Sequence, residues 1–447
     1  MRQTLFFIQD RVANFPVFGF GVLLLLWLLG GGLVILWLVR KQGFNADTRS
    51  YIPVFVIVAL AIVFVLPNLL EPDHGLPVRS YGVMTMLAII SAIILATQRA
   101  HRYGIAKETI YAFAFWFCAA GFVGARIFHV IEYWKISYRK ETLDGSFAFL
   151  PTLIEILNVP QGGLVVYGAL IGGMIAFIFL VRRFRLPPLA FADFIAPSML
   201  LGLAIGRLGC LLNGCCFGGL CEAPWAVTFP QNSPPYNWQL ERGLPWGIQI
   251  GQGTSDKTIT LNRETGAPQE PVQILWRSPE LADRGLAVGD KIVRLNNVAN
   301  PQSEQIWRIL NSGSSNLEPT LLETQSGKVF ALHRDPLPDR SRTIHPTQIY
   351  SSISAFLLSL VLLAYMPFRC RDGEVFGLMI TIYPVIRILL EIIRTDEIAQ
   401  FGTGLSISQL VSLLILAGVS IYWVIVFRQP SGTLRLAPDF SESTHTS

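Results

Sequence analysis

The sequence is poor in charge for its length. Only 15% of its 447 residues are Asp, Glu, Lys or Arg, whereas 52% are hydrophobic. A soluble globular domain has about 25% charged residues, so this composition is typical of a polytopic membrane protein. The net charge of +5 is also small and gives no indication of nucleic-acid binding.

Sites that are common in soluble enzymes are absent too. No glycine-rich loop that would cradle a phosphate stands out, and neither does a Ser-His-Asp arrangement. Histidine occurs only six times, and His74, His101 and His129 are too scattered to form a metal site. We therefore expect neither a metal nor a cofactor.

Long apolar runs are what the sequence has in abundance. A helix needs about 20 apolar residues to cross the hydrocarbon core. Nine runs meet or nearly meet this length, and they lack the alternation of a membrane β-barrel. They lie at residues 15–39, 51–70, 80–98, 109–131, 163–181, 190–213, 347–366, 373–393 and 404–427. We predict nine membrane-spanning helices. The first is too long for the core of a signal peptide and lacks a cleavage site, so we expect it to be retained.

The positive charges of the short loops predict the orientation of the chain. Alternate loops are rich in Arg and Lys, beginning with the one that holds Arg40, Lys41 and Arg49. These loops and the C-terminal tail are expected in the cytoplasm. The N-terminus and the long segment 214–346 are then expected in the periplasm. The tail 429–447, with its Ser, Thr, Pro and acidic residues, is expected to be disordered.

Segment 214–346 is the substantial soluble part of the chain. Its stretch "GLAVGDKIVRLNN" predicts a turn, an alternating strand and an Asn-Asn turn, and "SEQIWRIL" follows with helical spacing and Ser303 as its cap. Upstream, "LPWGIQIG" at 244–251 is a candidate strand. This order resembles a bacterial PDZ domain over about residues 270–335. The resemblance implies that the insert binds a C-terminus or an extended peptide by strand addition. A spacer that binds nothing is the alternative.

Ionisable residues inside apolar runs are the functional candidates, because each costs roughly 2.5–3.5 kcal/mol on insertion. Arg126, Asp193 and Arg207 lie within or at the rim of separate runs. The stretch "YPVIRILLEIIR" at 383–394 places Tyr383, Arg387, Glu391 and Arg394 along one helix face. One interpretation is a packing network in which Arg387 and Glu391 neutralise each other.

A lipid phosphate is the other interpretation of these arginines. A guanidinium binds phosphate oxygens through two parallel hydrogen bonds and keeps its proton at any physiological pH. Arginines that face a membrane cavity therefore favour an anionic lipid from the outer leaflet. This reasoning does not separate an enzyme from a lipid-binding scaffold.

Six motifs in one order identify a family resemblance. They are "RSYGVMTML" (79–87), "GARIFHVIEYW" (124–134), "GGLVVYGALIGG" (162–173), "DFIAPSMLLGLAIGRLG" (193–209), "HPTQIY" (345–350) and "YPVIRILLEIIR" (383–394). Together they resemble the prolipoprotein diacylglyceryl transferases, membrane enzymes that begin bacterial lipoprotein maturation. The resemblance implies an all-α polytopic membrane protein with a seven-helix core in two parts, residues 79–213 and 347–428. Two extra transmembrane helices in 1–78 precede this core, and a small α+β PDZ-like insert in 214–346 interrupts it.

The resemblance also implies a reaction. The family transfers the diacylglyceryl group of phosphatidylglycerol to the lipobox cysteine of a preprolipoprotein at the inner membrane and releases glycerol phosphate. The reaction needs a general base for the thiol and cations for the departing phosphate. By resemblance, Arg207 and Arg387 hold the phosphate and Glu391 orients Arg387. Arg126 matches an arginine of another outer-side motif, and it too is expected to bind phosphate.

Further residues fall on motif positions of the family. Tyr81 matches a tyrosine of the first core helix and is a catalytic candidate. Asn213 and Tyr383 are expected to support the site. Asp193 and His345 match recurrent family residues, for which we expect a structural role.

The chain departs from the family pattern at three positions. Tyr167 stands where the family motif "HGGLIGG" has a histidine, and Cys210 and Cys215 replace the first Asn and the Glu of "GRxGNFxNxE". An ordinary tyrosine titrates near about 10, so it is a weaker base than histidine unless nearby arginines lower its pKa. Two alternatives to a transferase follow. One is a non-catalytic lipid-binding or peptide-sensing scaffold, and the other is a thiol–redox protein.

Four cysteines lie in or just after this signature, namely Cys210, Cys215, Cys216 and Cys221. Their spacings of five, one and five match no standard zinc pattern. Near an oxidising outer face, two of the four are candidates for a disulfide. Inert thiols, metal or redox chemistry, and a thiol that takes part in group transfer are the alternatives that the sequence leaves open.

Overall fold

A computed structural model gives the fold for most of the chain. It describes residues 3–12, 15–71, 74–140, 147–158, 162–243, 246–252, 272–302, 305, 306, 309, 319–332, 339–395 and 404–430. The chain divides into two compact units, each described here by itself. The first comprises residues 84–111 and 181–447, and the second comprises residues 2–83 and 112–180.

Eight described helices are long and apolar enough to cross a membrane. They are α1 (Val22–Gln42), α3 (Ser80–Ala100), α4 (Lys107–Glu132), α6 (Val166–Arg183), α7 (Pro188–Asn213), α11 (Thr347–Tyr365), α12 (Glu374–Ile393) and α13 (Ile407–Phe427). Each coincides with one of the predicted apolar runs, so these eight predictions are confirmed in length and composition.

The ninth predicted span, residues 51–70, is helical but is not among these eight helices. Helix α2 (Ala46–Leu60) passes into one π-helical turn at Ala61–Val65 and a 3₁₀ turn at Leu66–Leu69. Among the described residues an apolar helical stretch runs over Phe55–Leu69, and it ends with the tighter turn that holds Pro67. Helix α2 packs on α1, where the Trp27 ring nitrogen donates to Phe55 O at 3.1 Å.

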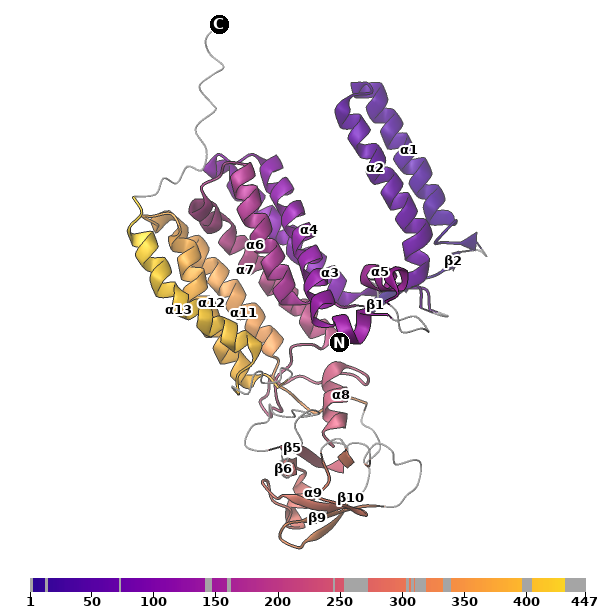
Figure 1. The fold of residues 1–447 in the computed structure, drawn as a ribbon, viewed down its shortest axis with the longest axis vertical. Coiled ribbons are helices and arrows are strands. Elements are labelled where there is room, and N and C mark those ends of the chain that lie inside the picture. The colour runs from indigo at the N-terminus through magenta and orange to yellow at the C-terminus, as the bar shows by residue number, and fades with distance from the viewer. Residues whose placement is uncertain are drawn as a thin grey trace. The chain divides into compact units, whose positions relative to one another are not determined.

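Helices α7, α11, α12 and α13 lie side by side in the first unit (Figure 1). Hydroxyl groups join α11 to α7, since Ser352 Oγ donates to Ala204 O at 2.8 Å and Ser359 Oγ donates to Pro197 O at 2.7 Å. Such hydrogen bonds hold helices together where lipid removes the hydrophobic drive for association.

Asp193 fastens α7 to the start of α12. Its carboxylate is fully buried and lies 2.8 Å from Arg369 Nη1. It also accepts the backbone N–H groups of Gly373 and Phe376, both at 2.7 Å. A carboxylate on the first free N–H groups of a helix is a stabilising cap. The structural role that we expected for Asp193 stays a prediction, which these contacts make testable.

The second unit is built on a close crossing of α4 and α6. A methyl group on Gly124 would lie within 3.0 Å of Gly168 O and the Gly172 backbone, so only glycine permits this approach. The "GALIGG" motif thus sets the packing of α6 through small residues. It also fixes the first turn of α6, where Tyr167 lies.

The insert contains helices α8 (Pro234–Glu241) and α9 (Pro279–Asp283) and two antiparallel sheets. One sheet pairs β5 (Ile248–Gln252) with β6 (Val272–Arg277). The other has the order β10-β9-β7-β8, with β7 at Ile292–Leu295, β8 at Val298–Ala299, β9 at Thr320–Thr324 and β10 at Val329–Leu332. The remaining short elements, in the second unit, are β1 (Thr4–Ile8), β2 (Arg11–Val12), β3 (Phe15–Pro16), β4 (Leu76–Arg79) and α5 (Phe149–Leu157).

Both strands predicted in the insert are confirmed. They are β5 and β7, and buried Ile248, Ile292 and Leu295 join one apolar core. The predicted cap Ser303 and most of the following helix lie outside the described residues, as does the tail from residue 431. The insert is α+β as expected, while its likeness to a PDZ domain stays a prediction.

Replacement of Asp193 tests its role as an anchor. The Asp193→Ala variant leaves the buried Arg369 without its closest partner, so we expect a loss of about 3–5 kcal/mol in the free energy of unfolding. Asp372→Ala is the matched control, since Asp372 pairs with the same arginine but is 27% exposed. Denaturant titration in detergent measures both, and equal losses would contradict the anchor role.

Candidate functional site

The candidate site begins where α7 ends. Helix α7 closes after Asn213 with Gly214 in the left-handed region, at φ 81°. The N–H groups of Gly214 and Cys215 both donate to Cys210 O, at 2.8 and 3.1 Å. This glycine turn reverses the chain, so the residues after it return toward the last turn of α7.

The "HPTQIY" segment holds the reversed chain. His345 and residues 218–219 exchange backbone hydrogen bonds of 3.2 and 3.0 Å. Thr347 Oγ1 donates to Cys216 O at 2.6 Å, and Gln348 Nε2 donates to Cys215 O at 2.7 Å. We had not predicted Thr347 and Gln348 as site residues, although their motif was a signal. The structural role expected for His345 stays a prediction.

Arg207 lies about two helical turns before Gly214. Its Nη1 donates to Cys216 Sγ at 3.5 Å, and its Nε is buried with no hydrogen-bond partner within the described part of the chain. Buried polar groups in proteins are nearly always paired. An open guanidinium N–H of this kind suits an anionic oxygen from a ligand.

Glu391 on α12 organises the other arginines. It is fully buried, and its Oε2 lies 3.1 Å from Arg387 Nη2 and 3.2 Å from Arg394 Nη1. Arg387 Nη2 also donates to Ser408 Oγ on α13 at 2.8 Å. The predicted pairing of Arg387 with Glu391 is thus present. Sequence reasoning had placed Arg394 on this helix face but gave it no role.

The site carries an excess of positive charge. Arg394 pairs by backbone with Gly218 in the cysteine loop, and Arg207 interacts electrostatically with both Arg394 and Tyr383. Two guanidinium groups, those of Arg387 and Arg394, thus share the single carboxylate of Glu391, and a third, that of Arg207, lies near Arg394. Because charges at membrane depth are costly unless compensated, this arrangement favours an anion.

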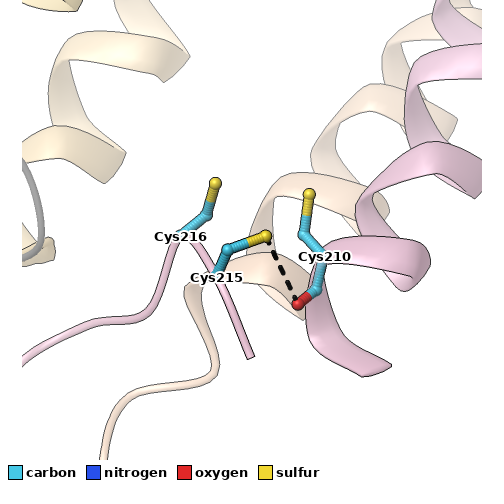
Figure 2. A group of neighbouring side chains, drawn as sticks. All are labelled: Cys210, Cys215 and Cys216. Carbon is cyan, nitrogen blue, oxygen red and sulfur yellow. Dashed lines mark hydrogen bonds between the residues drawn. The ribbon is translucent and has the colours of Figure 1, made fainter. Parts of the chain in front are cut away.

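Three cysteines converge beside Arg207. The sulfur atoms of Cys210, Cys215 and Cys216 lie within 4.8 Å of one another (Figure 2). The Cys215 thiol donates to Cys210 O at 3.8 Å. A hydrogen bond from the Cys210 thiol, with the nearby charges of Arg394 and Arg207, lowers the pKa of the Cys216 thiol.

The disulfide for which two of these four cysteines were candidates is not formed in this structure. All six cysteines are free thiols. Cys221, which we grouped with the other three, is buried apart from them, and its sulfur accepts the Ala223 N–H at 3.4 Å.

Arg126 has other partners than those we expected. Its five N–H groups donate to five backbone carbonyls at 2.7–3.0 Å, those of Glu155, Ile156, Asn158, Gly162 and Gly163. A guanidinium has only five donors, so none is left for the predicted lipid phosphate. In this structure Arg126 instead fixes the loop that leads into α6.

The remaining candidates divide between the two units. Tyr81, at the start of α3 and 45% exposed, and Tyr167 lie in the second unit with Arg126. The first unit holds Arg207, Asn213, Tyr383, Arg387 and Glu391. Asp193 precedes Arg207 by 14 residues, about 21 Å along α7, so it lies far from the site.

Comparison with known proteins gives one family. The family profile described as prolipoprotein diacylglyceryl transferase matches residues 67–425. A phosphatidylglycerol–prolipoprotein diacylglyceryl transferase of Rhodopirellula baltica is 35% identical over 98% of this chain and 92% of its own length. Proteins with the same name from Clostridium tetani and Synechococcus elongatus are 25% and 30% identical, over 79% and 40% of this chain and 96% and 58% of their own lengths. The first of these relatives matches the N-terminal helices and the insert as well as the core.

Substitution of the loop glycines tests the role of Arg126. A methyl group at Gly163 would lie 2.7 Å from Arg126 Nη1 and from His129 Cε1, so Gly163→Ala should displace the guanidinium. Gly162→Ala is the control, since its φ of 96° is equally left-handed but its Cβ would meet nothing within 4 Å. We expect Gly163→Ala to cost about 1–3 kcal/mol more in denaturant titrations. If the two variants are equally stable, Arg126 does not depend on this loop.

Proposed function

The chain belongs to the prolipoprotein diacylglyceryl transferase family, and on this premise we propose how its own residues perform the reaction. The protein transfers the diacylglyceryl group of phosphatidylglycerol to the lipobox cysteine of preprolipoproteins, the first step of bacterial lipoprotein maturation. It acts in the inner membrane, where its apolar helices are embedded. The substrates are one membrane lipid and one membrane-anchored polypeptide.

Arg207 supplies the observation on which the site assignment depends. Its buried Nε–H has no hydrogen-bond partner among the described residues, and its guanidinium lies near Arg394, one of the two arginines paired with Glu391. The phosphate of phosphatidylglycerol accepts from Arg207 and Arg387, which hold it through charge-assisted hydrogen bonds. Glu391 orients Arg387, while Asn213 and Tyr383 support the cluster from α7 and α12.

In the reaction, the glyceryl carbon exchanges its bond to the phosphate oxygen for a bond to sulfur. The lipobox thiol loses its proton, and the sulfur attacks the glyceryl carbon that carries the phosphate. A carbon–sulfur bond forms while the carbon–oxygen bond to the phosphate breaks. Its electron pair leaves with glycerol phosphate, which takes up a proton. The arginines stabilise the charge that develops on the departing phosphate. Such electrostatic stabilisation is commonly the largest contribution to the rate enhancement of an enzyme.

Tyr81 and Tyr167 assist as hydrogen-bond donors. A phenol holds its proton at neutral pH, so it suits donation to a phosphate oxygen better than removal of a thiol proton. Their positions in the family motifs support this role. Arg126 contributes indirectly, because it fixes the loop before Tyr167.

The insert lies on the periplasmic side with the N-terminus, and the C-terminus is cytoplasmic. The positive charges of the alternate loops support this orientation. In the insert, the edges of the larger sheet are β10 and β8 among the described strands, and an edge strand can bind an extended peptide. The insert docks the preprolipoprotein or a partner peptide there. Deletion of residues 272–332 without effect on substrate range or rate would contradict this docking role.

Complementation of a transferase-depleted bacterium tests the function. We expect the wild-type protein to restore lipoprotein thioether formation, measured by mass spectrometry. Arg207→Lys and Arg387→Lys keep the charge but lose the guanidinium fork, so each should lower the rate by about 100-fold or more. Arg340→Lys is the matched control, because the hydrogen bonds of Arg340 to the described residues go to Thr228 in the insert. Failure of the inserted wild-type protein to form thioether would favour a lipid-binding scaffold.

Removal of one hydroxyl tests the role of Tyr167. If the phenol donates to the departing phosphate, Tyr167→Phe should lower the rate of thioether formation by about 100-fold, the usual cost of one such donor. Tyr111→Phe, at an exposed tyrosine of α4, should have no effect. An unchanged rate for Tyr167→Phe would remove Tyr167 from the site.

A further inference from the structure

The three converging cysteines are unexplained by the phosphate site. Cys210 comes from the last turn of α7, and Cys215 and Cys216 come from the loop just after it (Figure 2). The glycine turn at Gly214 brings them together through the hydrogen bonds to Cys210 O. Their spacing matches no standard zinc motif, which is why the sequence predicted no metal here.

The sulfur positions suit a tetrahedral metal. Zinc binds cysteine sulfur at about 2.3 Å in tetrahedral geometry, which separates neighbouring sulfurs by about 3.8 Å. The three sulfurs already lie within 4.8 Å of one another, so small side-chain rotations are enough to close the site. Thiolates select soft or borderline metals, zinc among them, over magnesium or calcium.

The surrounding residues hold the cysteine loop in a strained form. Cys216 has a φ of 57°, a left-handed conformation that is unfavourable for a residue other than glycine. Thr347 and Gln348 fix the carbonyls on either side of it, and Arg207 donates to its sulfur. Backbone strain that several contacts impose is typical of ligand sites, and such outer contacts orient metal ligands.

Charge also favours a metal at this place. Zinc with three thiolates carries one negative charge, and Arg207 beside Cys216 offsets it. Three protein ligands leave a fourth tetrahedral position open, as in catalytic zinc sites. A thiol that coordinates a metal is deprotonated by it, so no separate base is needed.

We propose that Cys210, Cys215 and Cys216 bind one zinc ion and that its fourth position takes the sulfur of the lipobox cysteine. The role of the metal rests on the proposed function. It explains how the chain activates a thiol although Tyr167 and the two cysteines replace the family's histidine, asparagine and glutamate. On binding, the lipobox thiol gives its proton to water. Its sulfur then forms the bond to the glyceryl carbon, glycerol phosphate leaves with the electron pair, and the metal keeps its charge.

Metal content and cobalt binding test the site without reference to activity. The protein purified in detergent without chelator should contain one zinc per chain. Metal-free protein titrated with Co²⁺ should develop thiolate-to-cobalt charge-transfer absorption, which saturates at one equivalent. Cys215→Ser should lose both signals. Cys221→Ser, at a buried cysteine outside the group, should keep both.

A lipobox peptide tests the open position. The peptide with its cysteine should intensify the charge-transfer absorption of the cobalt protein, whereas the same peptide with serine should not. Thioether formation from phosphatidylglycerol should fall by about 100-fold in metal-free protein, the usual scale of lost thiol activation, and return when Zn²⁺ is added.

The outcomes separate the two proposals. Thioether formation at full rate without metal would overturn the zinc site and leave the transferase function intact. A mass lower by two hydrogens, with no cobalt bound, would replace the zinc site by a disulfide. If the three sulfurs bind zinc but the zinc-loaded wild-type protein forms no thioether, the transferase function is contradicted. The assignment of the fourth zinc position to the lipobox cysteine then fails with it.

Discussion

The buried carboxylate of Glu391 is the interaction on which the rest of the site depends. A charge this deep is stable only when it is paired, and Glu391 holds both Arg387 and Arg394. Arg387 reaches α13 through Ser408, and Arg394 pairs with Gly218 of the cysteine loop. One carboxylate thus ties α12, α13 and the loop after α7 together. Because it has two arginine partners and Arg207 lies close by, the positive charge that remains is available to a phosphate.

The two ends of α7 have different tasks. At its start, both carboxylate oxygens of Asp193 accept hydrogen bonds, from Arg369 and from the first N–H groups of α12, so Asp193 fixes helix packing. At its other end, Arg207 has a buried N–H without a partner among the described residues, and the glycine turn brings three thiols together beside it. A lipid-binding enzyme site needs both a rigid helix and a polar group that can still bind the ligand.

Much of this arrangement could be predicted from local sequence patterns. The lengths of the apolar runs predicted eight of the membrane-spanning helices. The spacing of four residues between Arg387 and Glu391 predicted their ion pair. Both predictions depend only on helix geometry. The ninth run is helical as well, with a described apolar stretch at Phe55–Leu69 that ends at the turn holding Pro67, and its role as a span stays a prediction. The family motifs predicted Arg207 as a site residue. They did not indicate that its Nε would be buried without a hydrogen-bond partner among the described residues.

Contacts between distant segments could not be predicted. Thr347 and Gln348 act on carbonyls more than 130 residues earlier in the chain, and nothing in their own neighbourhood signals this. Arg126 looked like a phosphate ligand because a buried arginine is costly, yet backbone carbonyls of a later loop meet its five donors. The convergence of the sulfurs likewise depends on a turn at Gly214 that residue spacing alone does not reveal.

A structure of the protein with phosphatidylglycerol bound tests the central claim most directly. We expect a phosphate oxygen within hydrogen-bond distance of Arg207 Nε, with Arg387 on the same phosphate and Glu391 still between its two arginines. A phosphate bound to Arg126, or a protein oxygen that fills Arg207 Nε while the lipid lies elsewhere, would contradict it.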